Sequence, residues 1–114
     1  MSDCVFCKII SGELPSKKIC EDEHVLVIHD IVPEAPLHAI ILLKRHVENA
    51  LEAAELPDNI LAHIWRVAAK VAAETGIAES GFRIVNNCGE DACQSVLHFH
   101  VHVLGGRKMS EHVG

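Results

Sequence analysis

The chain has 114 residues, 49% of them hydrophobic, which suffices for a buried core and argues against a disordered protein. We therefore expect one domain over residues 1–114. Its 16 acidic and 10 basic residues give a net charge of −6, whereas duplex-binding proteins normally carry a basic excess, so we expect no nucleic-acid partner. No apolar run approaches a membrane span and no secretory signal is visible, which predicts a cytoplasmic protein without a membrane partner.

The N-terminal segment contains the only meaningful spacing among the five cysteines, Cys4-Val-Phe-Cys7. An odd number of cysteines without a secretory signal fits a disulfide framework poorly. A Cys-x-x-Cys pair occurs in redox centres, as half of a zinc site, or as two ordinary thiols, and the spacing alone leaves these open. Residues 5–10 predict a short helical turn that Ser11-Gly12 ends.

The following segments predict three strands and two helices. The strands are expected over residues 18–20, 24–30 and 39–43, as an antiparallel meander. Residues 47–54 predict a short helix. Apolar residues at helical spacing predict a long helix over 58–75, with Gly76 at its end and His63 as a partly exposed surface residue.

The remaining segments are a fourth strand over residues 82–87, a loop over 88–95 and a strand that carries three histidines. The order predicts an α+β fold whose five-stranded, mostly antiparallel sheet packs with one long and one or two short helices. An apolar edge strand in so small a domain also favours a homodimer. We expect its interface at residues 58–75 and 82–87, with a continuous ten-stranded sheet.

The last strand places imidazoles on alternate residues, His98, His100 and His102, which therefore share one face. The residues between them are apolar and can be buried on the other face. Such a face can hold a metal through several imidazoles, support a nucleophilic imidazole, or simply be exposed. A metal-dependent hydrolase or oxygenase would usually add a carboxylate, for which Glu90 and Asp91 are the nearby candidates.

The segment His98-Phe-His-Val-His-Val-Leu104 resembles the signature of the histidine-triad family, His-φ-His-φ-His-φ-φ with φ apolar. The resemblance points to the branch of purine-nucleoside phosphoramidases rather than to dinucleoside-polyphosphate hydrolases or uridylyltransferases. The likeness extends over almost the whole chain and includes Phe6-Cys-Lys-Ile-Ile, His29-Asp30-Ile31, Pro36 followed by His38, Lys44-Arg45-His46, Asn87, Gln94-Ser95 and Leu104-Gly-Gly-Arg107.

The resemblance implies that the protein hydrolyses purine nucleoside phosphoramidates and related acyl-nucleotides through a nucleotidyl-histidine, with no catalytic cofactor. It implies that His100 is the nucleophile and that Ser95, His102 and His98 complete the catalytic group. The nucleotide-binding residues that it implies, besides His100, His102 and Ser95, are Phe6, His29, Asp30, Ile31, Asn87, Cys93 and Gln94. The alternatives are a dinucleoside polyphosphate hydrolase and a non-catalytic purine nucleotide-binding module.

In zinc-bearing members of the family the first histidine of the triad is a metal ligand. The resemblance therefore implies a structural zinc held by Cys4, Cys7, His46 and His98; the alternative is a metal-free protein with two ordinary thiols. Ala92 and Cys93 stand where this branch often has two glycines. Backbone approach to a phosphate tolerates these residues only with negative φ, so the sequence leaves the geometry of this loop open. The C-terminal tail also differs from some relatives, which leaves the leaving-group preference open.

Overall fold

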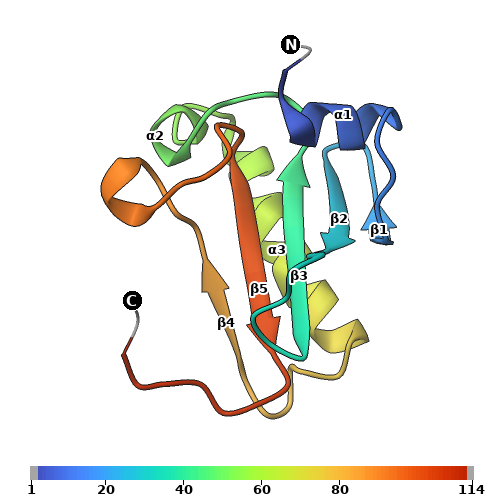
Figure 1. Cartoon of the computed structure of the whole chain (residues 1–114), viewed down its shortest axis with the longest axis vertical. Coiled ribbons are helices and arrows are strands. Elements are labelled where there is room, and N and C mark those ends of the chain that lie inside the picture. The colour runs from blue at the N-terminus through green and yellow to red at the C-terminus, as the bar shows by residue number, and fades with distance from the viewer. Residues whose placement is uncertain (1–2, 113–114) are drawn as a thin grey trace.

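The computed structural model describes residues 3–112. Figure 1 shows one sheet with a long helix behind it and a short N-terminal helix at its upper end. The elements follow the chain as α1 (Val5–Ser11), β1 (Lys18–Glu21), β2 (Val25–His29), β3 (Leu37–Leu43), α2 (Ala50–Ala53), α3 (Asp58–Glu74), β4 (Phe82–Val85), the 3-10 turn η1 (Glu90–Ala92) and β5 (His100–Gly105). Among the residues described, no helix is long and apolar enough to cross a bilayer.

The sheet has the strand order β1-β2-β3-β5-β4, and every neighbouring pair is antiparallel. The first three strands form the predicted meander. The chain then passes through α2 and α3 and returns as β4 at the edge and β5 in the interior. In the β3–β5 register Ile40 lies opposite His102 and Leu42 opposite His100, so both histidines sit at the centre of the sheet.

One face of the sheet is covered by α3, whose apolar residues Ile64, Val67, Ala68, Val71 and Ala72 are buried. The alternate residues of β5 and the segment before it, Phe99, Val101 and Val103, belong to the same core. This is the apolar half of the predicted alternation. Burial of this stripe is the main reason that a 17-residue helix forms here.

The opposite face carries a smaller apolar cluster, in which Phe6 of α1 packs against residues of β2 and β3. The N-cap of α1 is Cys4, whose Sγ accepts a hydrogen bond from the Cys7 N–H at 3.3 Å. The helix ends at Gly12, whose φ of +88° lies in the left-handed region that favours glycine. Between these two ends, the Phe6 ring contacts the rings of His98 and His100 edge-on, which places α1 against the histidines.

The structure confirms the predicted α+β fold and corrects several boundaries. The expected helix over residues 47–54 is only Ala50–Ala53, because Asn49 caps it with hydrogen bonds to the N–H groups of Leu51 and Glu52. The last strand begins at His100 and not at His98. Beyond Leu43 strand β3 offers no further partner, and the His98 side chain rather than its backbone bonds to the Leu43 carbonyl.

Candidate functional site

The imidazole of His100 lies at the start of β5 and is only 5% exposed. Its Nδ1 donates a hydrogen bond to the His98 carbonyl oxygen at 2.7 Å, which leaves Nε2 without a proton in the neutral ring. Phe6 contacts the ring edge-on, with centroids 4.9 Å apart. Burial lowers the pKa of His100, opposed by the bond to the His98 carbonyl and by Asp30, so the ring is neutral near pH 7. A neutral imidazole with one nitrogen held in this way is suited to nucleophilic attack.

His98 is fully buried and has the opposite tautomer. Its Nε2 donates to the Leu43 carbonyl oxygen at 2.7 Å, so Nδ1 carries the lone pair. That Nδ1 lies 3.3 Å from Cys4 Sγ and 3.5 Å from Cys7 Sγ. Burial, with smaller contributions from His46 and His100, lowers the pKa of His98 against the effect of the Leu43 bond.

The metal-ligating atoms of Cys4, Cys7, His46 and His98 all lie within 4.8 Å of one another. The His46 Nδ1 is 3.3 Å from Cys7 Sγ and 3.0 Å from His98 Nδ1. Two thiolates and two imidazoles are a donor set of structural zinc sites, and the unprotonated His98 Nδ1 is directed at the other three ligands. Burial and the Cys4 thiol raise the pKa of Cys7, so a cation here would relieve an unfavourable ionisation. The residues therefore fit a zinc ion.

A second cluster is formed by Asp30, His38 and His102, whose ligand-type atoms also lie within 4.8 Å of one another. The His38 Nε2 lies 2.8 Å from His102 Nδ1 and 3.4 Å from Asp30 Oδ2. The Nδ1 of His38 accepts the N–H of Glu34 at 3.0 Å. Burial, followed by the neighbouring His100 and His38, lowers the pKa of His102 to about 4, against the effect of Asp30. His102 is therefore neutral near pH 7, and its ring centroid lies 5.1 Å from that of His100.

The predicted phosphate loop precedes β5. Gln94 uses its side chain within the fold, where it accepts the Gly89 N–H at 2.9 Å and donates to the carbonyl oxygens of Glu48 and Val96. Ser95 is exposed. The φ of Cys93 is +60°, the one positive value among the described residues other than glycine, so the negative φ that close backbone approach to a phosphate would need is not met there. The 3-10 turn over Glu90–Ala92 places Cys93 in this conformation, at a cost of about 1–2 kcal/mol for a residue with a Cβ.

The predicted nucleotide-binding residues at the end of β2 differ in exposure. Ile31 is 89% exposed and His29 is also exposed, whereas Asp30 is half-buried. Asp30 Oδ1 accepts the Val32 N–H at 2.8 Å, which makes Asp30 a turn residue as well as a neighbour of His38. Asn87 is partly exposed in the segment between β4 and η1.

Three groups to which the sequence assigned no role take part in the site; one of them, His38, was named only as part of the resemblance. His38 links Asp30 to His102, and the backbone N–H of Glu34 holds His38. Asn86 donates from Nδ2 to the His100 carbonyl oxygen at 2.8 Å. His38 lies on the same strand face as Ile40 and Leu42, opposite the end of β5, so the strand pairing was the signal that could have found it.

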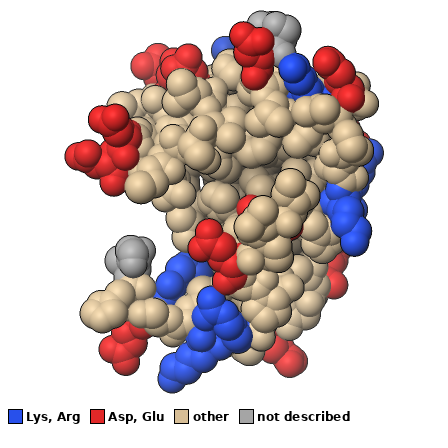
Figure 2. All heavy atoms as spheres, viewed as in Figure 1, with Lys and Arg blue, Asp and Glu red and all other residues tan. Residues whose placement is uncertain are grey.

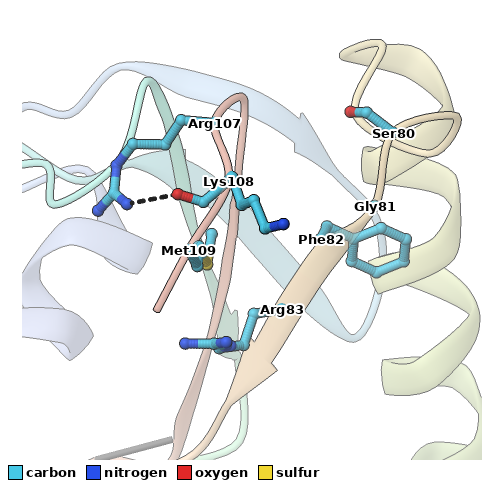
Figure 3. Close-up of a pocket in the computed structure, with 7 residues that line it drawn as sticks. All are labelled: Ser80, Gly81, Phe82, Arg83, Arg107, Lys108 and Met109. Atoms are coloured by element: carbon cyan, nitrogen blue, oxygen red, sulfur yellow. Dashed lines mark hydrogen bonds between the residues drawn. The ribbon is translucent and has the colours of Figure 1, made fainter. Parts of the chain in front are cut away.

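The surface around the site is hollowed on one side, between the segment that carries η1 and the C-terminal segment (Figure 2). Lys and Arg side chains gather beside the C-terminal segment, where Arg83, Arg107 and Lys108 help to line a cavity of about 200 Å³ (Figure 3). Arg83 donates to the carbonyl oxygens of Ser110 and His112, and Arg107 to those of Glu34 and Lys108. Arg83 therefore fastens the C-terminal segment to β4, and Arg107 fastens it to the segment between β2 and β3.

The HIT domain model matches residues 11–109 of this sequence. The chain belongs to the HIT domain family. A 14 kDa zinc-binding protein from Zea mays is 44% identical to this HIT protein over 111 residues, 96% of this chain and 86% of the relative. Adenylylsulfatase HINT1 from Arabidopsis thaliana is 44% identical over 113 residues, 96% of this chain and 75% of the relative. The structure of a HIT family hydrolase from Clostridium thermocellum has a TM-score of 0.90 and 46% identity, covering 99% of this chain and 98% of that one. These relatives confirm the family and the fold predicted for this HIT protein.

Proposed function

We propose that this HIT protein hydrolyses purine nucleoside phosphoramidates, and related acyl-nucleotides, through a covalent nucleotidyl intermediate on His100. The observation that carries the proposal is the 2.7 Å hydrogen bond from His100 Nδ1 to the His98 carbonyl oxygen. It fixes the tautomer in which Nε2 has a free lone pair. The similarity to proteins named hydrolase and adenylylsulfatase supports chemistry on a nucleotide phosphate.

In the first step the lone pair of His100 Nε2 forms a bond to phosphorus. The bond from phosphorus to the leaving nitrogen breaks, and the leaving amine takes up a proton. In the second step a water oxygen attacks phosphorus, the bond to His100 breaks, and a nucleoside monophosphate and a proton are released. Two steps replace one that would have to position water, phosphate and leaving group together. The phosphate charge would be met by Ser95, His102 and amides of the loop at Cys93 and Gln94.

The arrangement of the histidines supports a nucleophile over a metal-dependent reaction at the triad. His98 faces Cys4, Cys7 and His46, whereas His102 faces His38 and Asp30, so the three rings do not converge on one point among the described residues. His100 itself bonds to a backbone carbonyl. The proposed zinc at Cys4, Cys7, His46 and His98 would be structural, because it would join α1 to the end of β3 and take no part in the reaction.

Trapping of the intermediate tests this proposal. The reaction with a purine phosphoramidate is quenched in alkali. Intact-mass spectrometry should then reveal a nucleoside monophosphate adduct, and peptide mapping should place it on the peptide that contains residues 96–103. An adduct on another residue would mean that the nucleophile is wrongly assigned. Because acid destroys phosphohistidine, the control is the same sample quenched in acid, where the adduct should be absent.

A substrate panel separates the alternatives. Phosphoramidates should be turned over faster than dinucleoside polyphosphates, and the opposite ranking would favour a dinucleoside polyphosphate hydrolase. Nucleotide binding without any turnover would favour a non-catalytic module. Asp30, with Ile31, His29 and Asn87, is proposed to hold the ribose and base, and Phe6 to line the base pocket beside His100.

We also propose a homodimer that joins two sheets along β4 into ten strands. Strand β4 is an edge of the sheet, and Trp65 on α3 is 66% exposed. An apolar cavity of about 220 Å³ lies between α3 and the strands β4 and β5. It is lined by Leu61, Ile64, Trp65, Ala68, Ile84, Asn86, Phe99 and Val101. A second copy would cover these residues. Sedimentation at micromolar concentration should give a dimer, and Trp65→Glu should shift it to monomer; a monomeric wild-type protein would exclude the proposal.

A further inference from the structure

The hydrogen bonds around His38 form a chain whose direction is set at one end by the backbone. The Glu34 N–H lies 3.0 Å from His38 Nδ1 and can only donate. The Nδ1 of His38 must therefore be the acceptor, without a proton of its own. A neutral imidazole has one N–H, so the proton of His38 is on Nε2.

The second link follows from the first. His38 Nε2 lies 2.8 Å from His102 Nδ1, and since Nε2 carries the proton, His102 Nδ1 must accept it. Asp30 Oδ2, at 3.4 Å from the same Nε2, is a weaker second acceptor that also favours this state of His38. His38 is only 5% exposed, so water does not readily substitute for either link.

We infer that His38 is a positioning residue, which fixes the tautomer of His102 so that its Nε2–H is presented as a hydrogen-bond donor beside His100. Among residues 3–112 the His102 Nε2 has no hydrogen-bond partner, and it is not buried. It is thus the free end of the chain that begins at the Glu34 N–H. The rings of His102 and His100 are 5.1 Å apart, so a phosphate oxygen on the phosphorus bound to His100 lies within the reach of this donor. This last statement rests on the proposed function, whereas the tautomer does not.

The same chain argues against a metal at Asp30, His38 and His102. A metal bound to His38 Nε2 would require either a proton on Nδ1, facing the Glu34 N–H, or a fully deprotonated imidazole. Such a metal would also remove the hydrogen bond that His38 Nε2–H donates to His102 Nδ1. The cluster is therefore a hydrogen-bond chain, although its residue types match a metal site.

The direct test is the tautomeric state of the histidines in the full-length wild-type protein. Two-bond proton–nitrogen correlation spectra at pH 7 distinguish a ring protonated on Nδ1 from one protonated on Nε2. We expect Nε2–H for His38 and His102, and Nδ1–H for His100. A His102 protonated on Nδ1 would overturn the inference, whether or not the protein turns over any substrate, so this failure is distinct from failure of the proposed function.

Variants test whether His38 acts through His102. His38→Leu removes the donor, and we expect kcat for a phosphoramidate to fall at least about 10-fold with KM within about 3-fold, short of the 10²–10³-fold that complete loss of such a donor costs. His38→Gln, whose amide N–H can replace Nε2–H, should restore most of the loss. In a His102→Ala background His38→Leu should have no further effect; an equal effect in both backgrounds would show that His38 is only structural.

A matched control is His63→Leu. His63 also contacts a carboxylate, with Nε2 2.7 Å from Asp22 Oδ2, but it lies on α3 away from the triad. We expect unchanged kcat and an unchanged His102 spectrum. If His38→Leu does not fold, the wild-type tautomers still decide the question.

Discussion

The two clusters of ligand-type side chains in this protein contain similar residue types but have backbone partners of opposite kind. One cluster lies at the start of α1 and consists of Cys4, Cys7, His46 and His98; the other lies at the other end of the histidine triad and consists of Asp30, His38 and His102. In the first cluster a carbonyl oxygen, that of Leu43, accepts the proton of His98. In the second cluster an N–H, that of Glu34, is accepted by His38.

This difference decides what each cluster can bind. The Leu43 carbonyl keeps the proton of His98 on Nε2, so Nδ1 has a lone pair that can bind a cation. The Glu34 N–H leaves His38 Nδ1 without a proton. The proton of His38 is therefore on Nε2, which donates it to His102 Nδ1. The residue types of these two clusters therefore do not by themselves decide which one suits a metal; the hydrogen-bond partner of the second ring nitrogen does. His100 lies between the clusters. Its Nδ1 donates to a carbonyl oxygen, and its Nε2 has no hydrogen-bond partner among the described residues.

The largest effect is expected for the residue that belongs to neither cluster. His100→Ala should lower the rate of phosphoramidate hydrolysis at least about 10³-fold, because it removes the covalent step and several kcal/mol of transition-state stabilisation. Nucleotide binding should survive, as measured by calorimetry. Chelation of metal from the wild-type protein should leave turnover largely intact. Full activity of the variant would instead assign the chemistry to one of the clusters.

The next largest effect is expected on zinc content and stability, and it should distinguish the two clusters. Wild-type protein purified without chelator should carry about one zinc per chain, and Cys4→Ser should remove it and lower the stability by at least about 2 kcal/mol, roughly 8 °C in Tm. Cys88→Ser is the matched control and should keep the zinc. His38→Leu should keep it too. A wild-type protein with clearly less than one zinc, and no change in Tm for Cys4→Ser, would exclude the site.

A smaller effect is expected on the pH dependence of stability, through His102. Its pKa of about 4 in the folded protein lies below the value near 6.5 of an unfolded chain. As pH falls from about 6.5 toward 4 the unfolded chain takes up a proton that the folded protein does not, so stability present above pH 6.5 is lost. Because the ring is partly exposed, we expect a loss of about 1–2 kcal/mol. Urea unfolding of His102→Asn should show a correspondingly flatter profile between pH 7 and 5, whereas parallel profiles would contradict this assignment.

The smallest effect is expected for Ser95→Ala. Ser95 is exposed and lies outside both clusters, and its proposed role is one hydrogen bond to phosphate. Loss of one such bond costs about 1 kcal/mol, so kcat/KM should fall by less than about 10-fold. Steady-state kinetics of Ser95→Ala and His100→Ala, measured under the same conditions, give the loss of kcat/KM in each variant. A loss as large as that of His100→Ala would contradict a role limited to one hydrogen bond.

Most elements could be predicted from local patterns. The alternation from His98 to Val103 predicted a strand with one apolar face, and the apolar spacing over residues 58–75 predicted α3. The limits of β5 could not be predicted, because they depend on where its partner β3 ends. The φ of Cys93 could not be predicted either, since a 3-10 turn and not the residue type sets it.

The sequence by itself determined the fold class, the family resemblance and the residue types available for chemistry. The His100 tautomer is set locally, by the carbonyl of His98 two residues before it. For His98 and His102, only the tertiary structure decided which nitrogen carries the proton. That choice depends on backbone groups far away in the chain, the Leu43 carbonyl for His98 and the Glu34 N–H acting through His38 for His102. For these two histidines the tautomer is set by a partner that is close in space but distant in the chain, and no periodicity or spacing along the chain contains it.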